Sequence, residues 1–272
     1  MTTTFEGMRD HARRDVYRPG SGLTPVRRFI NLNRRLSAAI ERRLPQAKDD
    51  LYARFDTLVA EYQRIAPNGV IADVGGGRTC SFAGLIDRCP GTKLIAIDIS
   101  AEELSFNHDA DETLIGDVNR GLPLSDGEAG LIVSRTLLEH VADNEAFIRD
   151  SSRALAKGGY AIHLVPCRNA PFAVVARVMP FALAKWLLHF FRPETTGLVE
   201  FPVFYDKCTF SEMKRTFKRH GFRSVTAHLS YYQSDYFDAF LPAYLASATY
   251  ELTVRTLGRK DLAAYMLVIA QK

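Results

Sequence analysis

The fold is decided by the stretch Val70-Ile71-Ala72-Asp73-Val74-Gly75-Gly76-Gly77-Arg78-Thr79. Its first five residues form a nearly unbroken apolar run, which is typical of a strand buried on both faces of a parallel sheet. Three consecutive glycines follow, and glycine at such a turn lets the backbone approach a ligand closely. We therefore expect a buried strand, a ligand-binding turn, and a helix that begins near Thr79 or Ser81.

The same pattern recurs along the chain of 272 residues. Short apolar runs alternate with amphipathic stretches between residues 67 and 166, which is the mark of βαβ units. The expected strands are 70–74, 93–98, 113–115, 130–134, 160–165, 222–229 and 264–270. This pattern predicts an α/β fold with a doubly wound, seven-stranded, mostly parallel sheet.

An acid at the end of the second strand narrows the choice of ligand. Asp98 lies 23 residues beyond Gly75, where a carboxylate can accept hydrogen bonds from ribose hydroxyls. A dinucleotide fingerprint would need a third glycine at position 80, which is occupied by Cys80. The pattern Asp73-x-Gly75-x-Gly77 places an acid before the turn, and this acid suits a ligand that carries a cationic amine.

These motifs resemble the class I S-adenosylmethionine-dependent methyltransferases, in the branch that includes ubiquinone-type O-methyltransferases. The resemblance covers residues 68–166. Its ordered motifs are Asp73–Gly77, Ala96–Ser100, Gly116–Val118, Leu122–Leu124 with Gly130–Val141, and Arg153–Gly159, the last as the turn before the fifth strand. It implies S-adenosyl-L-methionine as cofactor, bound by Asp73, Gly75, Gly76, Gly77, Asp98, Ile99, Asp117, Val118 and Arg135.

His140 is the candidate general base, because it follows the fourth strand at the carboxyl edge of the sheet, where doubly wound folds place their sites. The alternative is that His140 only caps or packs beneath the site. In some relatives two glutamates and a histidine in this segment bind a divalent metal. Glu139 and His140 match that set, but Thr136 replaces the first acid, so we predict no metal.

The flanking regions indicate how the acceptor is bound. We expect an N-terminal helical arm or lid over residues 1–66, a methyltransferase domain over 67–272, and a substrate-side insertion at 167–207. Residues 1–50 hold eleven Lys and Arg against six Asp and Glu, whereas the whole chain is only +4. This basic arm suits phosphate, an anionic membrane surface or an acidic partner, or it is simply a solvated helix face.

Apolar and aromatic residues in the second half of the chain favour a flat or greasy acceptor. The aromatic candidates are Tyr205, Tyr231, Tyr232, Tyr236, Phe237 and Phe240. Residues 181–192 have an amphipathic pattern, which fits a lid, a homodimer contact or a peripheral membrane helix. No apolar run is long enough to span a membrane, and with four cysteines and no signal peptide we expect free thiols in the cytoplasm.

The predicted function is methyl transfer from S-adenosylmethionine to a small-molecule or lipid-like acceptor, at oxygen. Two alternatives remain open. One is C-methylation of a prenyl diphosphate or similar anionic apolar substrate, and the other is a non-catalytic S-adenosylmethionine-binding partner protein. A nucleic-acid substrate is not expected, because the chain has neither a base-flipping tetrapeptide nor a strongly basic overall charge.

Overall fold

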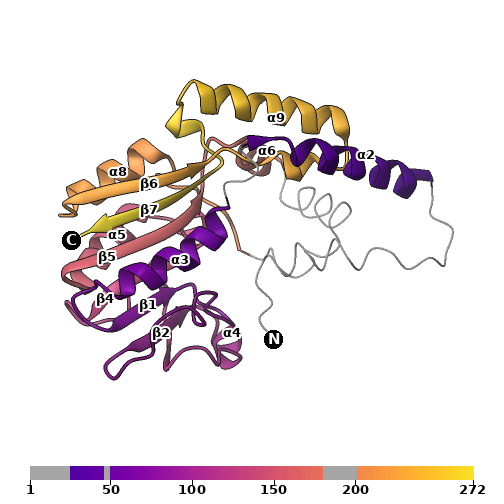
Figure 1. The fold of residues 1–272 in the computed structure, drawn as a ribbon. Helices are drawn as coiled ribbons and strands as arrows, with labels where there is room; N and C mark the ends of the chain where they lie inside the picture. Colours follow the sequence, from indigo (N-terminus) through magenta and orange to yellow (C-terminus); the bar gives the residue numbers. More distant parts are fainter. Residues whose placement is uncertain (1–24, 46–49, 180–200) are drawn as a thin grey trace.

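The computed structural model describes residues 25–45, 50–179 and 201–272. Its centre is one seven-stranded sheet with the order β3-β2-β1-β4-β5-β7-β6 (Figure 1). All neighbours pair in parallel except β7, which runs antiparallel between β5 and β6. The predicted doubly wound, mostly parallel sheet is confirmed.

The strands follow the apolar runs of the sequence closely. They are β1 (Val70–Val74), β2 (Lys93–Asp98), β3 (Glu112–Ile115), β4 (Ala129–Arg135), β5 (Leu155–Pro166), β6 (Ser224–Ser230) and β7 (Tyr265–Gln271). Residues of β1, β2 and β4 are almost all buried, because helices or turns cover both faces of the sheet there.

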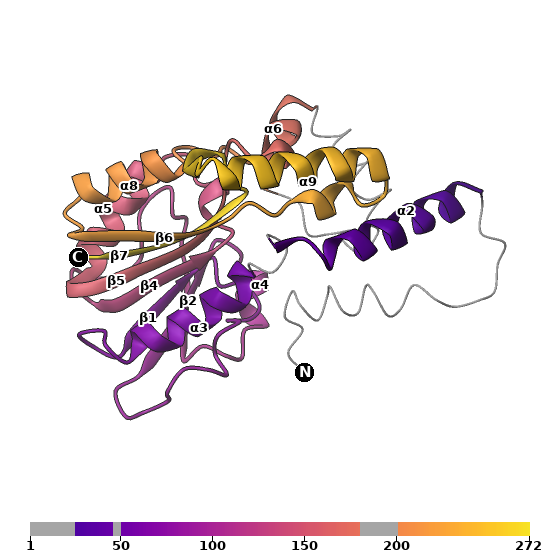
Figure 2. The ribbon, with the colours of Figure 1, turned by 45° about the horizontal axis from the view of Figure 1, so that its top comes forward.

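Helices cover the sheet on both faces and extend beyond one end of it (Figures 1 and 2). The α-helices are α2 (Pro25–Glu41), α3 (Leu51–Gln63), α4 (Ala101–Ser105), α5 (Asn144–Ala154), α6 (Pro171–Val178), α8 (Phe210–Arg219) and α9 (Leu241–Thr256). Short 3-10 helices are η2 (Leu138–His140), η4 (Ser234–Phe237) and η5 (Lys260–Leu262). One apolar core lies beneath α3, and the other lies beneath α5 and α8.

The predicted helix after the glycine turn is wrong, because residues 79–86 form a series of turns. Side chains from a later segment satisfy the backbone groups that such a helix would use. Asp109 accepts a hydrogen bond from the Cys80 amide at 2.9 Å, and Asn107 donates to the Gly77 carbonyl at 2.9 Å. Phe82 and Ile86 still bury their side chains in the core beneath α3, so the segment packs without becoming helical.

The turn expected over Arg153–Gly159 is also placed differently, since β5 already begins at Leu155. Gly158 adopts a φ of 83°, a conformation that glycine enters without strain, and its amide donates to the Lys272 carbonyl. The register between β4 and β5 shifts at this point, between Ala129 and Leu131. A glycine irregularity therefore lies within the strand where a turn was expected.

The two described helices of the N-terminal region have different surroundings. Helix α3 packs on the sheet and buries Phe55 and Val59, whereas α2 contacts α9 at the end of the molecule (Figure 2). The basic residues before Pro25 and the amphipathic segment 181–192 lie outside the described residues. Within the described ranges, every helix falls short of the length and apolarity that crossing a bilayer requires.

Candidate functional site

The glycine turn is fixed to the carboxyl end of the neighbouring strand β2. Both the Gly75 and the Gly76 amides donate to the Ile97 carbonyl, at 2.7 and 3.2 Å. Gly75 has a φ of 77°, which an L side chain adopts only with strain. The turn is therefore held open at the carboxyl edge of the sheet, where ligands bind in folds of this type.

Asp98 closes the second side of the turn. Its Oδ2 accepts a hydrogen bond from the Gly77 amide at 3.1 Å, and its Oδ1 accepts one from the Ser100 amide at 2.9 Å. Each carboxylate oxygen has a further lone pair, so the group can still accept from ligand hydroxyls. Asp98 does not cap the helix that follows, because Ser100 is the N-cap of α4.

A cavity of about 240 Å³ opens beside the turn. It is lined by Phe55, Asp73, Gly75, Gly76, Arg78, Thr79, Ser81, Arg135 and Thr136. Four of the predicted cofactor residues thus meet on one cavity, and Gly77 and Asp98 adjoin it through their hydrogen bond. Ile99, Asp117, Val118 and His140 are not among the lining residues.

The cavity gathers more negative than positive charge. Burial, with a smaller contribution from the carboxylates of Asp56 and Asp98, raises the pKa of Asp73 to about 6, against the opposing effects of a Cys80 hydrogen bond and of Arg135. Asp56, on α3, also has a raised pKa through burial, and it accepts a hydrogen bond from Ser81. Three carboxylates face the guanidinium of Arg135, and Arg78, which also lines the cavity, is paired with Glu103, so the balance of charge favours a cationic ligand. Asp56 was not predicted as a site residue, because an acid on a helix is usually solvated.

The remaining cofactor candidates lie at the outer edge of the turn. The Gly116 amide donates to the Asp98 carbonyl at 2.9 Å, which holds the Asp117 segment beside Asp98. Asp117 is half-buried and accepts from both nitrogens of Asn119. Ile99 is 54% exposed, whereas Val118 packs against the core. The exposed apolar face of Ile99 is thus available to a flat ring.

The segment that contains the glycine turn, Asp98 and Arg135 also matches a protein-family model. Residues 72–163 match the family model described as a methyltransferase domain. The chain carries a methyltransferase domain. S-adenosyl-L-methionine is the cofactor that such a domain implies, and its sulfonium and amine suit the acidic cavity. Comparison with curated protein sequences finds no match.

Solved structures share the fold of this methyltransferase domain at low sequence identity. A geranyl diphosphate methyltransferase, solved with GPP and sinefungin, is 16% identical with a TM-score of 0.52, over 80% of this chain and 77% of that one. The 4+2 cyclase SpnF is 17% identical with a TM-score of 0.51, over 81% of both chains.

A third similar structure is longer than this protein. Phosphoethanolamine N-methyltransferase 2 of Haemonchus contortus is 12% identical with a TM-score of 0.49, over 81% of this chain. The chain spans about half the length of that enzyme, 52%.

His140 lies in η2, beyond the cavity, and is half-buried. Its Nδ1 is 3.0 Å from the Pro202 carbonyl oxygen. A carbonyl only accepts, so Nδ1 carries the proton and the neutral ring keeps a lone pair on Nε2. That Nε2 is 3.9 Å from Oε1 of Glu139. Burial raises the pKa of Glu139 to about 8, and its Oε2 has no hydrogen-bond partner among the described residues.

Thr136, which stands where the metal-binding relatives have an acid, has a φ of 52°. Its amide donates to the Leu164 carbonyl at 2.8 Å, which holds this conformation against the next strand. Strained backbone of this kind is found where a loop must be directed toward a ligand. Among the described residues no cluster of three metal-ligating side chains is found.

An aromatic wall of Tyr52, Phe172, Tyr236 and Tyr265 runs from the cavity toward the surface. Arg135 lies 5.9 Å from the ring centre of Tyr52, and Tyr52 meets the edge of Tyr265 at 6.1 Å. Phe172 stacks on both Tyr265 and Tyr236, at 5.5 and 4.7 Å. The hydroxyls of Tyr236 and Tyr265 are 2.7 Å apart.

Tyr205 lies next to this wall and to Glu139. Burial, and then the charges of Glu139 and Tyr236, raise the pKa of Tyr205. Of the other aromatic candidates, Tyr232 is buried and Phe240 is 51% exposed. Tyr52, Phe172 and Tyr265 were missed in the sequence, because they come from three distant segments that meet only in the fold.

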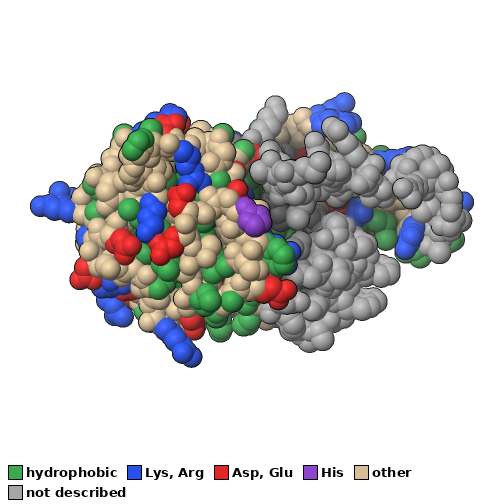
Figure 3. Space-filling view, turned by 90° about the horizontal axis from the view of Figure 1, so that it is seen from below, with side chains coloured by type: hydrophobic (Ala, Val, Ile, Leu, Met, Phe, Trp, Pro, Cys, Tyr) green, Lys and Arg blue, Asp and Glu red, His purple; other side chains and the backbone are tan. Residues whose placement is uncertain are grey.

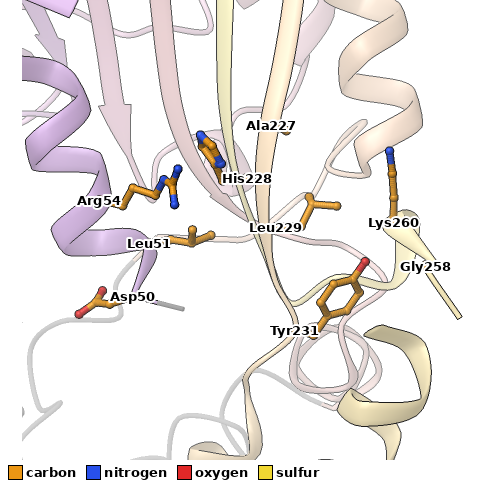
Figure 4. A pocket seen from close by; sticks show the side chains of 9 residues that line it. All are labelled: Asp50, Leu51, Arg54, Ala227, His228, Leu229, Tyr231, Gly258 and Lys260. Atoms are coloured by element: carbon orange, nitrogen blue, oxygen red, sulfur yellow. The ribbon is translucent and has the colours of Figure 1, made fainter. Parts of the chain in front are cut away.

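A second, larger cavity of about 540 Å³ lies at the edge strand β6 and shares no residue with the first. It is lined by Asp50, Leu51, Arg54, Ala227, His228, Leu229, Tyr231, Gly258 and Lys260 (Figure 4). Arg54 and His228 lie on one side of β6 and Lys260 on the other. Burial, and then the charge of Arg54, lower the pKa of His228.

Proposed function

We propose that this methyltransferase modifies a small-molecule or lipid-like acceptor at an oxygen atom. The observation that carries the proposal is the aromatic wall, which begins at Arg135 on the cofactor cavity and ends at the exposed ring of Tyr236. Aromatic surface of this kind binds flat or greasy molecules through apolar contact.

The tyrosine hydroxyls of the wall add polarity at one place only. Tyr236 and Tyr265 hydrogen-bond each other, which places two hydroxyls side by side within the largely apolar wall. An acceptor with an apolar body and a single oxygen function matches this arrangement. A multiply charged acceptor would need several cations, which this wall does not contain.

The cofactor supplies an activated methyl group, and the residues of the chain bind, orient and deprotonate. Asp73 lies at the start of the glycine turn and Asp98 beside its end, where each can bind one part of the cofactor. For the proton that leaves the acceptor oxygen we propose His140, whose Nε2 lone pair is set by the bond from Nδ1 to the Pro202 carbonyl. The Glu139 carboxyl, 3.9 Å away, keeps its own proton up to about pH 8, so below that pH it gives the protonated ring no opposing charge.

The test combines cofactor titration with an acceptor screen. Calorimetry with S-adenosylmethionine and its demethylated product should show binding that is weakened, yet still measurable, on Asp73→Asn. Phenols, fatty acids and prenyl diphosphates are then offered, and the methylated product is located by mass spectrometry and NMR. The proposal expects an O-methyl product from an apolar acceptor. A C-methyl product obtained only from prenyl diphosphates would replace it.

The role of His140 needs its own comparison. His140→Gln should lower kcat about a hundredfold or more while the cofactor Kd stays unchanged, because loss of a general base affects only the chemical step. His108→Gln is the matched control, since His108 is exposed and belongs neither to the cavity lining nor to the aromatic wall. Equal kcat values for the two variants would remove His140 as the base and leave the acceptor proposal standing.

A further inference from the structure

Helix α2 packs against the protein through polar side chains, whereas most surface helices pack through an apolar face. Asn33 and Ser37 are its buried residues. Asn33 Oδ1 accepts a hydrogen bond from the Leu241 amide at 2.8 Å, and Ser37 donates to the Asp238 carbonyl at 3.3 Å. Arg34 pairs with the Asp238 carboxylate at 3.4 Å. These polar contacts fix how the helix is rotated about its axis.

This rotation exposes an apolar stripe, which we call the α2 stripe: Phe29, Leu32 and Leu36. Their spacing of three and four residues places them on one helix face. They are 53%, 56% and 43% exposed. One exposed large apolar residue is ordinary, but three in a row along a helix form a patch that marks an interaction site.

Arginines border the α2 stripe. Arg28 and Arg35 each precede a stripe residue by one position, which places them along the same side of it, and both are exposed. Between Pro25 and Arg43 there are six arginines and one acid, Glu41. By contrast, Figure 3 shows charges of both signs interspersed over the sheet domain, whereas blue and green side chains are seen around the grey atoms at the α2 end.

A second copy of the chain fits this surface poorly. A two-fold contact through α2 would place the same arginines of both copies side by side, and like charges repel. An anionic lipid surface fits both the α2 stripe and the arginines beside it, because the acyl boundary takes up the apolar side chains and the headgroups attract the arginines. Long arginine side chains reach the headgroups while the apolar face is inserted.

We propose that α2 docks the protein on an anionic lipid surface, with the α2 stripe inserted and Arg28 and Arg35 against the headgroups. The residues that hold α2 lead toward the aromatic wall. Asp238 directly follows η4, which carries Tyr236. The wall is thereby tied to the docked helix, so a lipid-like acceptor would have a short path to it. The docking itself does not depend on which acceptor is methylated.

The test is flotation of the full chain with phosphatidylcholine vesicles, with and without phosphatidylglycerol, at low and high salt. Wild type should bind the anionic vesicles, bind pure phosphatidylcholine much less, and dissociate at high salt. Leu32→Ser/Leu36→Ser should lower binding about tenfold or more, since part of two leucine side chains no longer enters the lipid. Ile65→Ser/Leu257→Ser is the matched control, because these residues are 60% and 65% exposed elsewhere.

The charge contribution is tested separately. Arg28→Gln/Arg35→Gln should lower binding about 25-fold at low salt, at roughly fivefold for each arginine near an anionic surface. Arg149→Gln/Arg215→Gln, which alters two exposed arginines of α5 and α8, should bind as wild type does. Melting temperature and calorimetric cofactor binding should be unchanged in all variants, which separates this test from that of the proposed function.

Two results would overturn the docking proposal. One is wild-type protein that does not float with anionic vesicles, which would mean that the α2 stripe is covered by another segment or has no lipid partner. The other is a wild-type dimer in light scattering that becomes monomeric on Leu32→Ser/Leu36→Ser, which would assign the stripe to a contact between copies.

Discussion

Replacing Glu139 by glutamine should change how the stability of the protein depends on pH. The Glu139 carboxyl is buried, its Oε2 has no hydrogen-bond partner among the described residues, and its pKa is raised by burial from 4.5 to about 8. The folded protein therefore keeps this proton up to about pH 8, whereas the unfolded chain releases it near pH 4.5. Stability that is fully present below the lower pKa is lost as the pH rises through this window.

The expected size follows from the two pKa values. Within the window the free energy of unfolding falls by about 1.4 kcal/mol per pH unit through this one group. Glutamine has the same shape and no proton to release. The free energy of unfolding of Glu139→Gln, relative to that of wild type, should therefore rise by about 4 kcal/mol between about pH 5 and about pH 9. Other titrating groups cancel in the difference between the two proteins.

The assay is urea unfolding of both proteins across that pH range, followed by circular dichroism. Any constant cost of placing an amide in the buried position shifts the whole curve and leaves its slope unchanged. A difference between the two proteins that stays level with pH would refute the reasoning, because it would mean that the Glu139 carboxylate is ionised and solvated in the folded state.

Three further outcomes are expected. Gly76→Ala should lower cofactor affinity and cost about 1–3 kcal/mol of stability, because the new Cβ would lie 3.1 Å from the Asp73 carbonyl oxygen; Gly84→Ala, which meets nothing within 4 Å, is the control for calorimetry and melting. Cofactor affinity of wild type should weaken as the pH falls through about 6, where Asp73 gains its proton, and Asp73→Asn should abolish this pH dependence in the same titrations. Phe217→Ala should cost about 3–5 kcal/mol in urea unfolding, since the ring is fully buried against His163 and Phe222, and a cost below about 1 kcal/mol would show that the cavity collapses.

The sheet could be predicted from the sequence because its strands are local. Each buried strand is an apolar run, and the glycines of the turn and the acid of Asp98 lie at fixed distances from those runs. The helix expected after Gly77 failed for a different reason. Asp109 and Asn107, some thirty residues away, supply hydrogen bonds to that segment, and no local pattern reports such partners.

The candidate site was predictable only where its residues follow strands. Asp73, Gly75, Gly76 and Arg135 meet on one cavity because parallel strands end at one edge of the sheet. Asp56 and the wall residues other than Tyr236 were not predictable, because α3, α6 and β7 meet there through tertiary packing. The orientation of α2 likewise depends on Asp238 and Leu241, some two hundred residues further along the chain.

The place of β7 between β5 and β6 has a consequence for synthesis on the ribosome. β6 is translated before β7. In the finished sheet β6 is an edge strand, and β7 is the strand it pairs with. Until α9 and β7 have emerged, β6 exposes unpaired backbone, which is a template for aggregation. The insertion of β7 is therefore the step that closes the sheet, and nascent chains stalled within α9 should depend most on chaperones.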